Sequence, residues 1–257
     1  MSQRRKVAAS QGKRRSQAAL ENDGGEDVSF TQPTSSQLQR ARDNFTSVQV
    51  DHKAAEVVQF ILIKDQKKIP IRRTDIAKHI VKEYRAVYQD IMVRVGLIFE
   101  RVFGMELVEI DTKSHTYILI NKLEPTTEEP LSLNPKIGLL FVVLSVIFMK
   151  GGVIKEAVLK NTLKKLRVDF EERHDEFGDV KKLITEEFLR QKYLEYTRVP
   201  HTDPPEFEFR WGIRAEKEVS KLKIIELVGQ LHNQDPQIWT QQYREATSQS
   251  SQSSQRS

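Results

Sequence analysis

The central part of the chain opens with apolar residues at three- and four-residue spacing, the pattern of an amphipathic helix. This pattern covers residues 54–62 and ends in the charged stretch 64–68. Residues 69–71, Ile-Pro-Ile, predict a short edge strand because a proline cannot donate to a sheet ladder. Thr74 is then expected to cap a second helix, which runs to about residue 84.

A third apolar stripe and a hairpin complete the first unit. The stripe covers residues 91–102 and ends at Gly104, a residue typical of helix termination. Two extended segments, 105–110 and 116–121, flank the polar turn 111–115 and predict a hairpin. The order helix, short strand, helix, helix, hairpin is that of a winged helix.

The same order recurs after an acidic linker that contains prolines. Residues 137–149 predict an apolar helix, and residues 156–166 predict the next one. Thr185, followed by two glutamates, is expected to cap a third helix that runs through Arg198. Residues 207–211, Phe-Glu-Phe-Arg-Trp, alternate with period two and predict a strand of a second wing.

These patterns predict a mainly α fold with small β wings, a tandem winged helix, followed by a helix over residues 216–232. Both ends of the chain are rich in Ser and Gln and poor in large apolar residues, so we expect them to be disordered. The expected parts are a disordered basic tail over 1–49, winged helix A over 50–124, a linker over 125–135, winged helix B with a C-terminal helix over 136–245, and a disordered tail over 246–257.

The net positive charge of the chain is concentrated in the tails. The chain has 41 Lys and Arg against 36 Asp and Glu, a formal net charge of +5, but residues 50–245 have 32 basic and 31 acidic side chains. Binding of nucleic acid by this nearly neutral body therefore requires a local basic patch. The chain has no cysteine, which excludes disulfides and thiolate zinc sites. Its longest apolar run, 137–149, is shorter than the roughly 20 residues that a membrane-spanning helix needs, so no membrane partner is expected.

No pattern indicates catalysis. The six histidines are scattered, and the sequence has neither a phosphate-binding glycine loop nor the Gly-x-Ser-x-Gly turn of a nucleophilic serine. We therefore expect no catalytic residue, no cofactor and no metal site. The chain is interpreted as a binding protein.

Winged helices commonly place their third helix in the major groove of DNA. In the first unit that helix has few cations, whereas the second unit offers more. The candidate DNA-binding residues are Lys181, Lys182, Arg190, Lys192 and Arg198. An ordinary solvated surface is an equally good interpretation, and nothing in the pattern predicts recognition of a base sequence.

Seven Ser-Gln steps lie in the tails, and Ser-Gln is the preferred target of DNA-damage checkpoint kinases. Possible phosphorylation sites in the C-terminal tail are Ser248, Ser251 and Ser254, although drift in a low-complexity segment explains them as well. The basic clusters at residues 4–6 and 13–15 suit a nuclear import signal, a phosphate-binding grip or simply a solvated end.

Longer stretches resemble the MAGE (melanoma antigen) homology domain. These are residues 193–204 (Tyr-Leu-Glu-Tyr-Thr-Arg-Val-Pro-His-Thr-Asp-Pro), 207–212 and 142–151, and the similarity extends over roughly residues 51–245. Within the family, residues 59–71 and 232–236 are most similar to the members that serve as a non-SMC subunit of the SMC complex devoted to DNA repair.

The resemblance implies a non-catalytic subunit in the nucleus, associated with chromosomes and acting in double-strand break repair by homologous recombination. It implies that winged helix A binds and stimulates a RING-type E3 ubiquitin ligase subunit, with Ile61 and Leu62 at the family's paired-leucine position. Both residues also lie on the apolar stripe, so packing in the core is the alternative. Winged helix B is implied to bind the kleisin subunit, and the resulting heterotrimer is implied to bridge the two SMC heads and to contact double-stranded DNA.

Four positions depart from the family pattern: Lys160 replaces a common tryptophan, Arg167 a glycine, and Val180 and Ile213 prolines. The kleisin-contacting residues therefore stay unassigned. Two other functions remain open, namely a different MAGE adaptor that delivers substrates to a RING ligase and a winged-helix transcription factor.

Overall fold

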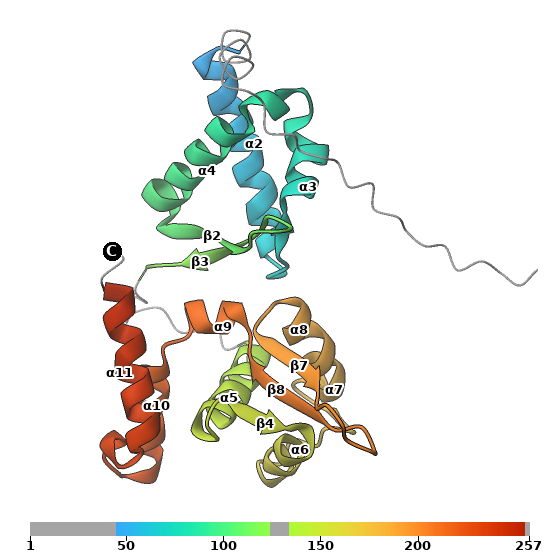
Figure 1. Ribbon diagram of the computed structural model, residues 1–257, viewed down its shortest axis with the longest axis vertical. Helices are drawn as coiled ribbons and strands as arrows, with labels where there is room; N and C mark the ends of the chain where they lie inside the picture. Colours follow the sequence, from blue (N-terminus) through green and yellow to red (C-terminus); the bar gives the residue numbers. More distant parts are fainter. Residues whose placement is uncertain (1–44, 124–133, 255–257) are drawn as a thin grey trace, which may run out of the picture. The chain divides into compact units, whose positions relative to one another are not determined.

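The computed structural model describes residues 45–123 and 134–254, with no side chains described for 250–254. It contains two lobes, each with a three-stranded antiparallel sheet and its own hydrophobic core (Figure 1). The predicted tandem winged-helix fold is confirmed. The expected tail over 1–49 and the linker over 125–135 lie largely outside the described residues, although the first helix already begins at Ser47 and the second lobe's first helix at Pro135.

The first lobe begins with α2 (Ser47–Asp65), which Thr46 caps through a reciprocal capping box with Gln49. The strand β1 (Ile71–Arg72) lies at the sheet edge, close to the predicted position. The second helical segment consists of α3 (Arg73–Ile76), η1 (Ala77–Val81) and η2 (Lys82–Val87). The prediction that Thr74 caps this helix is wrong, because the helix already begins at Arg73 and Arg72 occupies the cap position.

The third helix and the hairpin agree with the predicted pattern. α4 (Tyr88–Phe103) ends at Gly104, which adopts the left-handed conformation at φ 60°. β2 (Met105–Asp111) pairs with β3 (Thr116–Asn121), and β1 joins the other edge of β3. One member of the predicted core stripe differs, since Val102 is 70% exposed at the end of α4.

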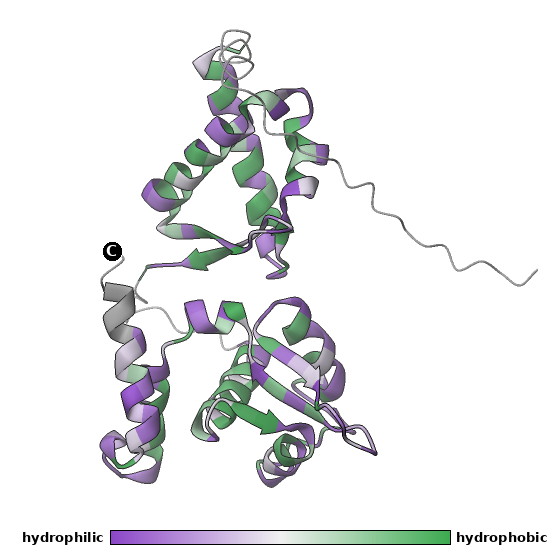
Figure 2. Ribbon diagram, viewed as in Figure 1, coloured by the Kyte–Doolittle hydropathy of each residue, from purple (hydrophilic) through white to green (hydrophobic). Residues whose placement is uncertain are grey.

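The second lobe begins with α5 (Pro135–Met149), capped by Asn134. The strand β4 (Val153–Lys155) and the helix α6 (Glu156–Lys165) follow in the predicted order. Figure 2 shows hydrophobic positions along α5 and β4, in contrast to the mostly hydrophilic coloured part of α11 (Thr240–Ser254). The hydrophobic α5 therefore lies at the centre of the second core.

The predicted third helix of this lobe, residues 185–198, is wrong in position. The helix comprises α7 (Val180–Lys182), η3 (Leu183–Glu187) and α8 (Phe188–Arg190). A hairpin of two two-residue strands, β5 (Arg173–His174) and β6 (Gly178–Asp179), precedes it. Asp179 is the cap, whereas the Thr185 hydroxyl donates to the Lys181 carbonyl inside the helix.

The second half of that prediction is a strand instead. Lys192 adopts a left-handed backbone at φ 67°, after which β7 (Leu194–Arg198) pairs with β8 (Phe207–Trp211). Tyr196 stacks on Phe207 across the pair, with ring centroids 4.8 Å apart. Cross-strand aromatic packing of this kind decides the conformation of a segment that also fits a helical pattern.

The C-terminal region differs from the single helix expected over 216–232. It contains α9 (Ile213–Glu218) and α10 (Lys221–His232), and Ser220 caps the latter. η4 (Pro236–Ile238) and α11 (Thr240–Ser254) follow. The expected disordered tail over 246–257 thus differs from the structure, in which the helix continues to Ser254 and Ala246 is fully buried. In the described ranges, no helix is both long and apolar enough to span a bilayer.

Candidate functional site

The C-terminal half of α2 contains the two residues implied to contact a RING protein. Ile61 is 0% exposed and belongs to the first core, and Leu62 is partly buried against the same core. The next residue, Ile63, is 66% exposed. Ile61 therefore packs in the core, which agrees with the alternative interpretation of this residue. Leu62 and Ile63 are accessible to a partner.

Ile63 is not among the partner-binding residues predicted from the sequence. A large apolar residue that lies off the helical stripe is the signal that could have identified it, because such a residue has no core to enter.

Three of the five candidate DNA-binding residues, Lys181, Lys182 and Arg190, lie on the third helix of the second lobe. Lys192 comes directly after that helix, and Arg198 ends the strand β7. All five are exposed. Lys181 Nζ lies 3.2 Å from Glu171 Oε2, and Lys182 Nζ lies 3.8 Å from Asp179 Oδ2. These carboxylates offset part of the positive charge that a phosphate would meet.

The surface beside this helix has more acidic than basic side chains, although the five candidate DNA-binding residues are all basic. A hollow between β6, α7 and the start of α5 is lined by five carboxylates and three cations, which are Asp175, Glu176, Asp179, Glu186, Glu187, Lys136, Lys182 and Arg190. Lys136 is paired with Glu187 at 3.0 Å. The third helix of the second lobe thus presents a mixed, predominantly acidic face.

The first lobe has the opposite balance. Residues 64–85 contain eight Lys and Arg against three Asp and Glu. The exposed cations of this segment are Lys64, Lys67, Arg72, Lys78, Lys82 and Arg85. None of them forms an ion pair with another described residue, and we call this set the first-lobe basic surface. This surface was not predicted from the sequence, because winged helices commonly bind DNA with the third helix, where Arg94 is paired with Asp51.

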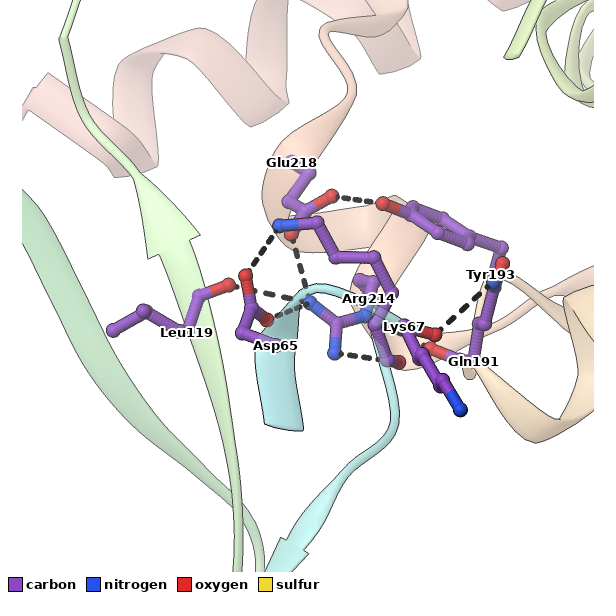
Figure 3. Close-up of polar contacts among 8 residues, drawn as sticks. Asp65, Lys67, Leu119, Gln191, Tyr193, Arg214 and Glu218 are labelled. Atoms are coloured by element: carbon purple, nitrogen blue, oxygen red, sulfur yellow. Dashed lines mark hydrogen bonds and ion pairs between the residues drawn. The ribbon is translucent and has the colours of Figure 1, made fainter. Parts of the chain in front are cut away.

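A fully buried guanidinium joins the two lobes (Figure 3). From α9, Arg214 donates to the carbonyl oxygens of Gln191, at 2.8 Å, Lys68, at 3.1 Å, and Leu119, at 3.2 Å. Lys68 and Leu119 belong to the first lobe. A buried charge is tolerated only when its hydrogen-bond donors are satisfied, and these three acceptors meet that condition together with a carboxylate.

That carboxylate is Glu218, whose Oε1 lies 3.0 Å from Arg214 Nη1 while its Oε2 accepts from the Tyr193 hydroxyl at 2.5 Å. Asp65 Oδ1 lies 3.8 Å from Arg214, too far for a hydrogen bond, and contributes by charge. Burial raises the pKa of Asp65, although its hydrogen bond from Lys68 opposes this shift. Burial likewise raises the pKa of Tyr193, so the hydroxyl keeps its proton and donates.

A second charged cluster ties the C-terminal helices together. Lys221 Nζ lies 2.9 Å from Glu216 Oε2 and 2.8 Å from Glu245 Oε1, and 5.1 Å from the centre of the Trp211 ring. Burial alone lowers the pKa of Lys221, but the hydrogen bonds with the two glutamates outweigh it and raise the pKa. Lys221 is therefore a fixed cation that α9 and α11 share.

Neither cluster has the donor set of a metal site, and within the described ranges no group of three or more His, Asp and Glu side chains is arranged to hold a metal ion. The described residues instead form exposed apolar and charged surfaces, which suit the binding of macromolecules.

Comparison with known proteins agrees with this picture. The model of the MAGE homology domain matches residues 57–222. The chain is 50% identical over 202 residues to the human non-structural maintenance of chromosomes element 3 homolog, covering 77% of this chain and 66% of that protein. Its identity to the mouse homolog is 51% over 205 residues, covering 78% and 74%.

Other family members are similar over the same region. Human melanoma-associated antigen D2 is 49% identical over 197 residues, covering 76% of this chain and 32% of that protein. A solved chain of the Nse1-Nse3-Nse4 complex superimposes with a TM-score of 0.75 at 52% identity, covering 79% of this chain and all of that one. The chain described here belongs to the MAGE homology domain family.

Proposed function

We propose that this protein is a non-catalytic subunit of an SMC complex, assembled with a RING-type E3 ubiquitin ligase subunit and a kleisin. The observation that supports this most is the likeness to a chain of the Nse1-Nse3-Nse4 complex, which covers that chain completely at 52% identity. Curated relatives named as homologs of element 3 agree with it. The absence of cysteine excludes a thioester to ubiquitin on this chain.

The first lobe is proposed to bind and stimulate the RING subunit through the end of α2. Leu62 and Ile63 supply the apolar contact, and the buried Ile61 holds them in place. Exposed apolar side chains beside buried ones are typical of the centre of an interface.

Co-purification with a RING subunit tests this assignment. Ile63→Asp is expected to abolish the complex while the isolated chain keeps its thermal unfolding midpoint. Val102→Asp is the matched control, because Val102 is similarly exposed, at 70%, on another helix of the same lobe. Retention of the RING subunit by Ile63→Asp, or its equal loss with Val102→Asp, would remove α2 from the interface.

The second lobe is proposed to hold the kleisin and, through it, the SMC heads. Co-expression of residues 134–257 with a kleisin, compared with co-expression of the full chain, tests this part. If SMC heads and kleisin never co-purify and a RING protein does, the chain is a different MAGE adaptor.

We also propose that the protein acts in the nucleus on chromosomes, in double-strand break repair by homologous recombination, and binds double-stranded DNA without sequence preference. The first-lobe basic surface and the second-lobe patch are the two candidate contacts, and the charge balance favours the former. Equal binding to unrelated duplexes in a competition assay is expected, whereas strong discrimination between them would indicate a transcription factor.

A further inference from the structure

The last described turns of α11 contain a Ser-Gln step whose two side chains have different environments. Ser248 is exposed, and its hydroxyl donates to the Arg244 carbonyl at 2.8 Å. Gln249 is partly buried. Its Nε2 donates to the Glu216 carbonyl at 3.0 Å, and its Oε1 accepts from the Lys221 backbone N–H at 3.2 Å.

These two backbone groups explain why the Gln249 amide is held. The Glu216 carbonyl lies in the last turn of α9, and the Lys221 N–H is the first of α10. Groups at helix ends have no partner within their own helix and need one from elsewhere. The Gln249 side chain satisfies one group of each kind, so it links three helices at once.

Further contacts fix α11 at the same place. Ala246 is fully buried, Glu245 pairs with Lys221 at 2.8 Å, and the Gln242 amide donates to the Met149 carbonyl at 3.2 Å. The side chain that follows Ser248 is therefore part of a packed interface.

We propose that Ser248 is a phosphorylation site for serine kinases that select glutamine at the next position, and that the docked α11 masks it. In the reaction the γ-phosphoryl group of ATP is transferred to Ser248 Oγ. The new P–O bond forms as the bond to ADP breaks, and the hydroxyl proton passes to the base of the kinase.

Masking follows from what such a kinase must reach. It has to surround the Ser248 hydroxyl and bind the Gln249 side chain, but both amide atoms of Gln249 are engaged with α9 and α10. The segment around Ser248 must leave those helices before it can enter an active site. Local opening of a terminal helix is a low-energy event in a folded protein.

Once added, the phosphate opposes re-docking. It carries a charge of about −1.5 to −2 three residues after Glu245, whose carboxylate pairs with Lys221, and like charges at this spacing on a helix repel each other. Arg244, four residues earlier, is the cation on the same helix that can pair with it. Phosphorylation is thus expected to hold this part of α11 away from α10.

The first experiment compares three full-length proteins incubated with ATP and a purified DNA-damage checkpoint kinase, with site-resolved mass spectrometry. Ala246→Asp buries a charge and undocks α11, and Gln241→Asp makes a similar change at an exposed position of the same helix. Ser248 is expected to be phosphorylated about tenfold faster in Ala246→Asp and at the wild-type rate in Gln241→Asp. Equal rates in all three proteins, or no phosphate on Ser248 in any, would overturn the proposal.

If circular dichroism shows that Ala246→Asp unfolds the second lobe, Glu245→Gln replaces it and is expected to raise the rate several-fold. A second experiment installs phosphoserine at position 248 and follows hydrogen exchange at the Lys221 amide. Exchange should be about tenfold faster than in Ser248→Ala. Unchanged exchange would show that the phosphate leaves α11 docked and would refute the proposed consequence.

Discussion

The two lobes share a fold but differ in charge and in the way their surfaces are held. In the first lobe the segment 64–85 exposes cations that have no ion-pair partner in the described chain, whereas in the second lobe Lys181 and Lys182 lie beside carboxylates. The same helix-and-wing scaffold therefore presents a basic face in one copy and a mixed face in the other. A fold establishes where a surface lies, and the side chains decide what it can bind.

The lobes also differ in how they are joined to each other. Each has a separate core, and Arg214 of the second lobe donates to carbonyls of both.

The largest effect is expected from Arg214→Ala. It leaves the partly buried Glu218 carboxylate without its cation and three carbonyls without their donor, so the free energy of unfolding should fall by about 3–5 kcal/mol. Urea denaturation followed by tryptophan fluorescence and by far-UV circular dichroism measures this change. Arg210→Ala, which removes an exposed guanidinium, is the control and should change stability by about 0.5 kcal/mol or less. A similar small loss for both variants would mean that Arg214 does not join the lobes.

Charge reversal tests the contrast between the surfaces. Lys78→Glu with Lys82→Glu is expected to weaken DNA binding equally for unrelated duplexes and to reduce the slope of log K against log salt by about 2, roughly 0.9 for each lost phosphate contact. Lys181→Glu with Lys182→Glu should have the smaller effect, because its cations already face carboxylates. Fluorescence anisotropy at several salt concentrations measures both. The reverse order would assign the DNA contact to the second lobe.

The smallest effect concerns acid stability. Although burial opposes it, hydrogen bonds from Tyr196 and Lys160 lower the pKa of Glu156 in the second lobe. A lowered folded-state pKa adds stability above the unfolded value near 4.3, and this stability is lost as pH falls through the folded pKa. Glu156→Gln should therefore be less stable than the wild type by about 1 kcal/mol at pH 7, and the difference should shrink as pH falls through the lowered pKa of Glu156.

Asp65 at the joint provides the comparison for that experiment. Its pKa is raised by burial, so its contribution has the opposite sign and weakens as pH rises through the folded value. Asp65→Asn should not reproduce the pH dependence of Glu156→Gln in thermal melts between pH 3 and 7. Parallel pH profiles for the two variants would contradict the contrast.

At three of the four positions that depart from the family pattern, the backbone conformation still suits the residue that the family commonly has there. Arg167 stands where the family often has glycine and adopts φ 62°, a conformation that favours glycine. Val180 and Ile213 replace prolines, and each is the first residue of a helix, where proline is favoured. Lys160, in place of tryptophan, lies over the Phe170 ring and pairs with Glu156 and Glu171.

Periodicity alone predicted α2, α4, α5 and the first hairpin, because each buries one continuous apolar stripe or alternating face against its own lobe. It failed for residues 185–198, where the capping pattern at Thr185 competes with the true cap at Asp179. Only the pairing of β7 with β8 makes the later residues a strand.

The candidate functional residues likewise divide into those that the sequence predicted and those that only the tertiary structure revealed. The sequence by itself determined the family and the tandem fold, and it predicted Ile61 and Leu62 as the partner-binding pair in α2. Tertiary structure decided that Ile61 is core while Ile63 is exposed, that Arg214 is buried, and that Gln249 docks a segment expected to be disordered. The physical reason is that burial of a charge or an amide depends on acceptors and donors from distant segments, and local patterns do not record those partners.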